Sequence, residues 1–584
     1  MTDVEMTGPD ATVAVLGLGT TGSAIAAALA RAGRRVVAVE ADDTALARGR
    51  ARVEELTGPD GGDIAFTTAT GRIADAELVI EAVPESAALK IEVLRAANTV
   101  CPPATVFVTT TTALPVAEIA AGSGRMARTT GLHLADPASG TVAEVVTTPV
   151  TDADAQDGTL ALARALGRTP VRVGDRAGFI GGALTMGYLN GAATMFERRH
   201  GTRDDIDAAM MLGCGLPLGP LAQLDRMGLD VAHDTLRILY ERTGDRRYAP
   251  SPVLAHMAAA GLLGRKSGRG FYDYGEAGEG AGGDTGTAAT EPAGEEGAAR
   301  PVRRVGVVGS GTMAAGIAEV CARAGLPTVL VARTDVRAKE ALAAVERSLE
   351  RRVRRGKVSA EDVAATMARL SGASRFDALT DRDLVIEAVV EDLKVKRETF
   401  RSLDEVCRPG TVLATTTSSL PVIECATATS RPHDVVGMHF FNPAPAMKLV
   451  ELVRTALTGE QALATARALC AALGKRPVDC ADRTGFIANA LLFPYLNHAV
   501  TMLQDGHATA DDIDAVMTQG LGLPMGPLQL LDVVGLDVSL AIQRELHAAH
   551  REPALTPARL LEELVLAGYT GRKAGRGFRA HEPR

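Results

Sequence analysis

The chain has 584 residues, which at roughly 150 residues per domain points to about four domains. Hydrophobic residues make up 46% of it and charged residues 23%, as in ordinary soluble globular proteins, and the net charge of −9 gives no reason to expect a nucleic acid as partner. The seven cysteines show no C-x-x-C spacing, which argues against a zinc site or a disulfide framework, and no apolar run is long enough to predict a membrane span.

The chain begins with an acidic, polar stretch, "MTDVEMTGPDAT", which is unlike a secretory signal, so the expected compartment is the cytoplasm. A strand is predicted at 12–17, followed by a glycine-rich turn "GLGTTG", an alanine-rich helix and a second strand at 35–40. This order is the fingerprint of dinucleotide-binding domains. The expected cofactor contacts are Gly17, Gly19, Gly22 and the strand-end acid Glu40.

The same series of motifs returns in the second half of the chain. "GRKSGRGF" starts at Gly264 and "GRKAGRGF" at Gly571, an offset of 307 residues (571 − 264), and "AGFIGGAL" and "TGFIANAL" keep that offset. The chain is therefore a tandem duplication, with each copy predicted to be a doubly wound, Rossmann-like α/β domain followed by a helical domain. The expected segments are 12–174 and 175–274 for copy 1, a flexible Gly/Ala/Glu-rich linker at 275–302, and 303–481 and 482–584 for copy 2.

In copy 2 the fingerprint is "GSGTMA", where Gly309 makes the tight turn, Gly311 lets the backbone approach the pyrophosphate, and Ala314 keeps helix and strand close. Its second strand ends on Ala332 and Arg333, where copy 1 has Glu40. Loss of the acid removes repulsion toward a 2′-phosphate, and Arg333 can bind that group. The sequence therefore favours NADP(H) in copy 2, with the alternative that Arg333 is a solvated surface residue and NAD binds. Copy 1 would bind NAD or nothing.

Copy 2 has fourteen more residues than copy 1 after this strand. Leu342, Val345, Leu349 and Val353 follow a helical period, Gly356 interrupts it, and Ser359 with Asp362 resembles a capping box that opens a second helix. A helical hairpin is predicted here. The copy 1 segment is too short for two helices.

Several motifs of copy 2, in this order, resemble the (S)-3-hydroxyacyl-CoA dehydrogenase family: "DLVIEAVVEDLKVKRETF", "TTTSSLP", "GMHFFNPAPAMKLVE", "DRTGFIANALL" and "GRKAGRGF". The resemblance implies reversible oxidation of a 3-hydroxyacyl-CoA to a 3-ketoacyl-CoA with a nicotinamide cofactor. His439 can serve as base and acid for the hydroxyl proton, and Glu451 can hold one ring nitrogen. By resemblance, Ser418 would bond the substrate hydroxyl and Asn489 the reacting group. Thr416 stands where the family usually has Asn.

The resemblance also implies the remaining contacts. Those expected for the cofactor in copy 2 are Gly309, Gly311, Thr312, Met313, Ala332, Arg333, Glu391 and Lys396, and those for the substrate are Ser418, Lys396, Asn442 and Asn489, with no metal. The hairpin and Lys396 favour CoA over a free acid. Alternatives are a substrate on an acyl-carrier protein, a CoA-free hydroxy acid, and a non-enzymatic structural protein.

Copy 1 departs from these motifs. His133 and Glu144 persist, but one residue is missing between them; Thr112 takes the place of Ser418 and Gly182 that of Asn489. Copy 1 is therefore predicted to be catalytically inactive. Family members usually pair through their helical domains, so the resemblance also implies an internal pseudo-dimer in which copy 1 supports copy 2, with higher oligomers open.

Overall fold

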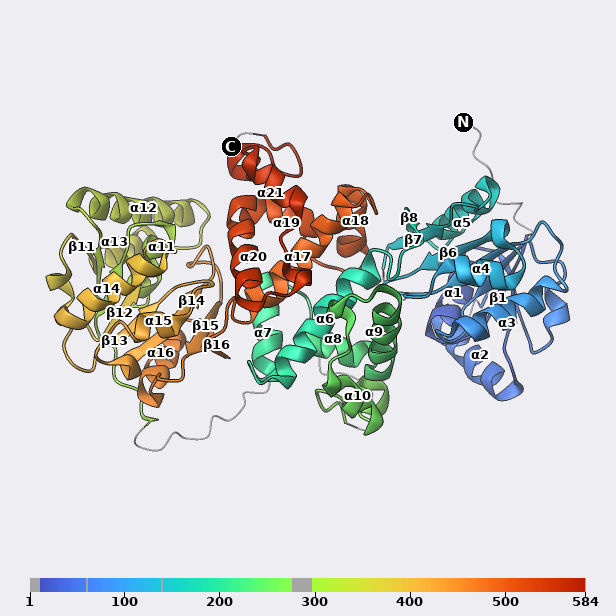
Figure 1. Cartoon of the computed structure of the whole chain (residues 1–584), viewed down its shortest axis with the longest axis horizontal. Coiled ribbons are helices and arrows are strands. Elements are labelled where there is room, and N and C mark those ends of the chain that lie inside the picture. The colour runs from blue at the N-terminus through green and yellow to red at the C-terminus, as the bar shows by residue number, and fades with distance from the viewer. Residues whose placement is uncertain (1–10, 59–60, 138–139, 276–296, 583–584) are drawn as a thin grey trace.

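The computed structural model describes residues 11–58, 61–137, 140–275 and 297–582. Figure 1 shows an elongated chain with an α/β domain at each end and the two helical domains between them. The predicted linker falls mainly on 276–296, outside the described residues. Among the described residues, no helix combines the length and the apolar character that crossing a membrane needs.

Each α/β domain is built on one eight-stranded sheet with the same strand order. The orders are β3-β2-β1-β4-β5-β6-β7-β8 and β11-β10-β9-β12-β13-β14-β15-β16, and all neighbours are parallel except β6–β7 and β14–β15. The strands are short, and the central strands of each sheet are buried along most of their length, as expected for a parallel sheet covered on both faces. In copy 1 the strands are β1 Thr12–Leu16, β2 Arg35–Val39, β3 Ile64–Thr67, β4 Leu78–Glu81, β5 Val106–Thr110, β6 Thr129–His133, β7 Val142–Thr147 and β8 Thr169–Gly174.

The copy 2 strands follow the same plan. They are β9 Val305–Val308, β10 Thr328–Val331, β11 Leu370–Ala373, β12 Leu384–Glu387, β13 Val412–Thr415, β14 Val435–Phe440, β15 Leu449–Arg454 and β16 Arg476–Ala481.

Helices cover the sheets and then form the helical domains. In copy 1 they are α1 Thr20–Arg31, α2 Asp43–Thr57, α3 Ala87–Asn98, α4 Val116–Ser123 and α5 Ala153–Ala165, and then α6 Gly181–Glu197, α7 Arg203–Cys214, α8 Pro220–Met227, α9 Leu229–Thr243 and α10 Pro252–Ala259. In copy 2 they are α11 Thr312–Arg323, α12 Asp335–Arg354, α13 Ala360–Met367, α14 Leu393–Val406, α15 Val422–Ala426 and α16 Glu460–Ala472, and then α17 Ala488–Gln504, α18 Ala510–Ala515, α19 Pro527–Val534, α20 Leu536–His550 and α21 Arg559–Leu566. A π-helical turn, η8 Val516–Gly520, continues α18.

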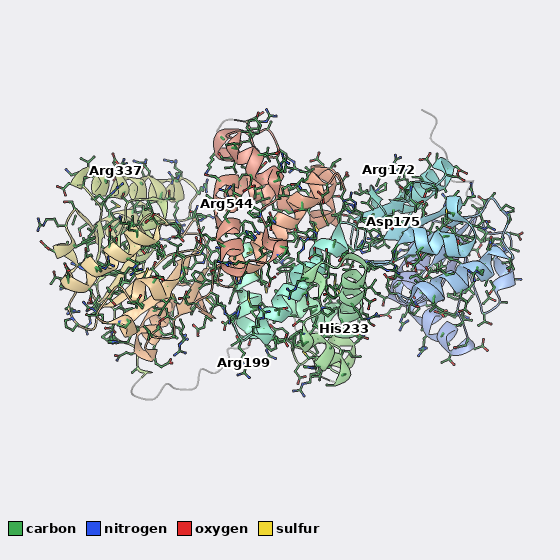
Figure 2. All side chains as sticks on the ribbon, in the orientation of Figure 1. Arg172, Asp175, Arg199, His233, Arg337 and Arg544 are labelled. Atoms are coloured by element: carbon green, nitrogen blue, oxygen red, sulfur yellow. The ribbon has the colours of Figure 1, made fainter. Side chains whose placement is uncertain are left out.

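The fold class predicted from the sequence, a doubly wound α/β domain plus a helical domain in each copy, is confirmed. The hairpin is present as α12 and α13, and Ser359 with Asp362 forms a reciprocal capping box at the start of α13. In copy 1, the described residues between β2 and β3 form α2 and no further helix. Arg337, labelled in Figure 2 on α12, is exposed and pairs with Glu340.

The two copies share apolar core between their helical domains. One cluster of buried side chains runs through both, whereas the two remaining large clusters each belong to one α/β domain. Helices α6 and α17 pack on each other at the centre, and the rings of Tyr188 and Tyr495 meet edge-on at 6.2 Å. Helix α7 of copy 1 also packs on β15 and β16 of copy 2.

Candidate active site

A histidine and a glutamate face each other across the antiparallel strand pair of copy 2. His439 is near the end of β14 and is the register partner of Glu451 on β15. Nδ1 of His439 lies 2.6 Å from Oε2 of Glu451, which is fully buried. The other carboxylate oxygen accepts the backbone N–H groups of Ile487 and Ala488 at 3.0 and 2.8 Å, where α17 begins. With Nδ1–H donating to the carboxylate, Nε2 is the ring nitrogen that can exchange a proton with a substrate.

Two phenylalanines pack around the imidazole. The Phe441 ring centroid is 4.6 Å from that of His439, and the Phe486 centroid is 5.6 Å away. His439 is only 7% exposed. This packing, together with Glu451, holds the ring in one orientation.

Ser418 and Asn489 lie together beside the loop after β13. The amide nitrogen Nδ2 of Asn489, on α17, donates to the carbonyl oxygen of Ser418 at 3.2 Å. The Ser418 backbone N–H and hydroxyl both donate to Glu391, at 2.8 and 3.2 Å. The structure thus brings Ser418 and Asn489 together, with Glu391 fixing the loop that carries Ser418.

Lys396 is buried beside two glutamates of its own domain. Its ammonium is buried and lies 2.9 Å from Glu387 and 3.3 Å from Glu391. Burial lowers the pKa of Lys396, but the charges of Glu387 and Glu391 raise it, with a net rise. For Glu391 the directions are reversed. Burial raises its pKa, but the Lys396 charge and hydrogen bonds from Thr417 and Ser418 lower it, and the pKa ends below its ordinary value. In this position Lys396 holds Glu391, and its contact with the cofactor and the substrate stays a prediction.

The glycine-rich turn of copy 2 has the shape that a dinucleotide needs. Gly309 has φ +135°, and a Cβ there would lie 2.3 Å from the carbonyl oxygen of Ala388. A Cβ on Gly311 would meet nothing within 4 Å, and no side chain caps the start of α11, so the N–H groups beginning at Thr312 and Met313 are available to a phosphate. These residues fit a nicotinamide dinucleotide. Just after β10, Ala332 is buried and Arg333 is exposed.

A cleft of about 530 Å³ opens between this turn, the hairpin and the loop after β14. Three arginines of the hairpin line it, and Asn442 lines the opposite wall. The lining includes Gly311, Thr312, Arg351, Arg352, Arg355 and Asn442.

Copy 1 keeps the dyad but only part of its surroundings. Nδ1 of His133 is 2.5 Å from Glu144, and Glu144 accepts the backbone N–H of Ile180 at 2.7 Å, as in copy 2. The missing residue shortens only the connection between the strands, because His133 and Glu144 are still register partners. A Cβ on Gly182 would lie 3.0 Å from the Thr112 methyl group. The threonine methyl therefore crowds the space where an asparagine side chain would begin.

Copy 1 also has the larger cleft, of about 900 Å³. Gly17, Gly19, Glu40, Thr112 and His133 all line it. One Glu40 oxygen accepts the Leu18 N–H of the glycine-rich turn at 2.5 Å, and the third glycine packs closely, since a Cβ on Gly22 would meet Gly17 O at 1.9 Å.

Models of two protein-family domains match both copies. The 3-hydroxyacyl-CoA dehydrogenase NAD-binding domain matches residues 12–176 and 304–483, and the C-terminal domain of the same family matches 178–274 and 485–581. The chain belongs to the 3-hydroxyacyl-CoA dehydrogenase family. The resemblance stated from the sequence is confirmed, including the tandem duplication.

Curated relatives correspond to one copy. A 3-hydroxybutyryl-CoA dehydrogenase of Mycobacterium tuberculosis is 46% identical over 279 residues, covering 47% of this chain and 98% of the relative. The mitochondrial hydroxyacyl-coenzyme A dehydrogenase of Rattus norvegicus is 40% identical over 284 residues, covering 47% of this chain and 90% of the relative. A crystal structure of 3-hydroxybutyryl-CoA dehydrogenase from Escherichia coli K12 has the same fold over 96% of this chain and 99% of its own, with a TM-score of 0.64 and 24% identity.

Some residues of this dehydrogenase site escaped the sequence reasoning. Glu387 is the last residue of the buried strand motif "LVIE" and pairs with Lys396. A charged residue at the end of a buried apolar run needs a partner, and this was the signal in the sequence. Phe441 lies in the "FFNP" motif, and its replacement by Ala135 in copy 1 was visible in the sequence.

Proposed function

We propose that copy 2 interconverts short-chain (S)-3-hydroxyacyl-CoA, such as 3-hydroxybutyryl-CoA, and the corresponding 3-ketoacyl-CoA. The observation that carries the proposal is the His439–Glu451 pair at 2.6 Å, next to the joined Ser418 and Asn489. A bound nicotinamide supplies the hydride acceptor for oxidation and the donor for reduction. Nε2 of His439 takes the hydroxyl proton during oxidation and returns it during reduction. Ser418 and Asn489 hold the oxygen that changes between alcohol and ketone.

Glu451 orients the base. Because it is buried and accepts two N–H groups of α17, it joins the sheet that carries His439 to the helix that carries Asn489. A negative charge beside Nδ1 also stabilises the imidazolium that forms when the proton is taken.

The CoA thioester is favoured over a free hydroxy acid by the hairpin cleft. Arg351, Arg352 and Arg355 line it together with the start of α11. Guanidinium groups bind phosphates through charge-assisted hydrogen bonds, and CoA carries phosphates that a free acid lacks. The preference for CoA rests on the cleft alone, because the ammonium of Lys396 is paired with Glu387.

Copy 1 is proposed to be inactive. It keeps the base and its orienting carboxylate, but Gly182 offers no side chain to the substrate oxygen, and the described residues between α2 and β3 form no second helix. The large cleft and Glu40 support retained NAD binding in copy 1, and an empty site is the alternative.

Copy 2 is proposed to prefer NADP(H). Ala332 leaves no carboxylate at the strand end, and exposed Arg333 stands next to it. An NADP(H)-dependent enzyme serves the reductive direction.

The two copies are proposed to act as an internal pseudo-dimer, for which the packing of α6 on α17 is the support.

One assay tests the activity and the cofactor together. Reduction of acetoacetyl-CoA is followed at 340 nm with NADPH and NADH in parallel, on the full chain. We expect turnover with both and a higher kcat/KM with NADPH. No turnover of acetoacetyl-CoA with either cofactor would contradict the proposed activity, and a preference for NADH would contradict only the cofactor assignment.

A further inference from the structure

The C-terminal end of helix α7, which belongs to copy 1, packs on the catalytic strands of copy 2. A Cβ built on Gly213 would lie 2.8 Å from Cδ2 of Leu449 and 3.0 Å from Cε1 of Phe441. Real Cβ atoms keep more distance from such neighbours, so the present arrangement needs a glycine at this position. Gly213 is helical, and an alanine there would fit the backbone but not the space.

Both neighbours of Gly213 belong to the machinery around His439. Phe441 is the ring at 4.6 Å from the imidazole. Leu449 precedes Glu451 by two residues on β15, so the two side chains point to the same face of the sheet. The next residue of α7, Cys214, is close enough to Glu451 to feel its charge. Burial raises the pKa of the Cys214 thiol to about 12, and the Glu451 charge adds to the rise.

The pseudo-symmetric contact in the other direction is loose. Gly520 of copy 2 corresponds to Gly213, 307 positions earlier, and faces Ala135 and Val142 of copy 1. A Cβ on Gly520 would be 3.8 Å from the Ala135 Cβ and 3.9 Å from the Val142 Cβ. Of these two glycines, the tight contact thus occurs at the one beside the His439 dyad, whose histidine has the second ring, Phe441, in addition to Phe486.

We infer that Gly213 of copy 1 is a positioning residue for the active site of copy 2. By admitting the end of α7 directly against Phe441 and Leu449, it sets Phe441 on the His439 ring and backs the strand that carries Glu451. Copy 1 thereby takes part in the reaction through its helix end, without touching the substrate. This inference rests on the proposed catalytic role of copy 2, and it adds a contribution from the other copy.

The test compares Gly213→Ala with the matched Gly520→Ala in the full chain. A displacement of catalytic groups by about 1 Å costs up to roughly a hundredfold in rate, so we expect kcat for acetoacetyl-CoA reduction to fall by about tenfold in Gly213→Ala. The KM for the cofactor should stay unchanged, because the glycine-rich turn lies on other strands. Gly520→Ala should keep the wild-type kcat, since its methyl group has room.

Rescue separates positioning from general damage. Leu449→Val removes Cδ2, the atom nearest to the added methyl group, and gives Leu449 the residue that copy 1 has at this position. In this background Gly213→Ala should lower kcat by less than about threefold, because residues in direct contact show coupled effects. An equal loss in both backgrounds would overturn the inference. The double variant also supplies a folded comparison should Gly213→Ala alone not fold.

A spectroscopic arm is independent of turnover. With histidine labelled at Cε1, the His439 resonance is identified by its absence in His439→Gln, and its shift reports the Phe441 ring current. We expect it to move in Gly213→Ala and to stay in place in Gly520→Ala. A movement in an enzyme that does not turn over acetoacetyl-CoA would support the positioning and refute the proposed function. An unmoved resonance with unchanged kcat would overturn the positioning role itself.

Discussion

At the residue scale, the same histidine–glutamate pair has two kinds of surroundings. Glu144 and Glu451 both accept backbone N–H groups at the start of the long helix that follows, so each joins a sheet to a helical domain. This structural task explains why the pair persists in copy 1 without the rest of the site. The two copies differ at the position of the asparagine, which is Asn489 in copy 2 and Gly182 in copy 1, and the proposed inactivity of copy 1 rests on this difference.

Removing the base from copy 2 should abolish most of the activity. His439→Ala or Glu451→Gln is expected to lower kcat by about a hundredfold or more, because positioned acid–base groups contribute roughly that much. The matched His133→Ala should leave kcat near wild type. Steady-state kinetics on folded protein decide the matter. A loss of half the activity or more in His133→Ala would show that copy 1 also turns over substrate.

The strand end of copy 2 should set the cofactor preference. Ala332→Asp combined with Arg333→Ala places a carboxylate where the ribose hydroxyls bind and removes the guanidinium. The kcat/KM ratio of NADPH to NADH should fall by about tenfold or more, as expected from a hydrogen bond to a charged group worth roughly 1.5–3 kcal/mol. The matched control is Arg337→Ala, farther along α12, where the ratio should not change. A wild-type ratio in the double variant would place the discrimination elsewhere.

Much of the site was predictable from residues, because its parts are local motifs. The glycine turn and the capping box are each set by a few neighbouring residues, and His439 with Glu451 by a short strand–loop–strand segment. The partners of Lys396, Glu387 and Glu391, depend on tertiary packing that a motif does not show. Gly213 was out of reach for the same reason: its neighbours Phe441 and Leu449 belong to the other copy.

At the element scale, the hairpin α12–α13 is the main addition of copy 2. Its helix α12 carries the exposed pair Arg337–Glu340 near its start and, nearer its end, three arginines that line the cleft. An exposed pair of this kind contributes little to stability. The three arginines that line the cleft are the ones in position to bind a ligand there.

Neutralising the three cleft arginines should weaken acyl-CoA binding selectively. The triple change Arg351→Gln, Arg352→Gln and Arg355→Gln is expected to raise the KM for acetoacetyl-CoA by about tenfold, through loss of charge-assisted bonds to phosphate. The matched control changes Arg354 and Lys357, which do not line the cleft, to Gln and should leave this KM unchanged. Equal effects of both sets would mean that only the overall charge of the hairpin matters.

Helices α7 and α18–η8 show how the two copies have adapted to each other. Residues 203–214 form one regular helix, whereas the homologous segment changes to a π-helical turn at 516–520. There the carbonyl oxygen of Gln519 accepts the backbone N–H and the hydroxyl of Thr141, both at 3.0 Å. The contact falls on the loop of copy 1 that is one residue shorter. The π turn thus contacts the shorter loop of copy 1. The regular helix α7 instead contacts β15, which follows the full-length loop of copy 2.

At the scale of the whole molecule, buried histidines lie at the junction between the copies. Burial lowers the pKa of His498 to about 3 and that of His200 to about 4, and nearby arginines add to both shifts. The ring of His498 lies 6.3 Å from that of Tyr248 in copy 1. Nε2 of His507 donates to the carbonyl oxygen of Phe179 in copy 1 at 3.0 Å, and burial lowers the pKa of His507 as well.

These shifts predict that acid loosens the junction. A histidine with a depressed pKa in the fold takes up its proton first in the unfolded chain, so its stabilising contribution is complete above pH 6.5 and is lost as the pH falls toward 3. The unfolding temperature should fall from pH 7.5 to pH 5, and less steeply in His498→Phe. The control His433→Phe alters an exposed ring and should leave the slope unchanged. Identical slopes in wild type and His498→Phe would contradict this view.

Copy 2 alone should be a poor substitute for the full chain, because its interface complements copy 1 better than it complements itself. A Cβ on Gly191 of α6 would lie 3.3 Å from Leu491 of α17, so the glycine admits that leucine. The homologous residue of Gly191 in copy 2 is His498, and a homodimer of copy 2 would place this imidazole against Leu491. Residues 301–584 expressed alone should therefore expose apolar surface and self-associate or precipitate, with a lower unfolding temperature. Light scattering after size-exclusion chromatography measures the association, and adding residues 1–275 as a separate chain should restore a one-to-one complex. A stable, fully active monomer of copy 2 would refute the supporting role of copy 1.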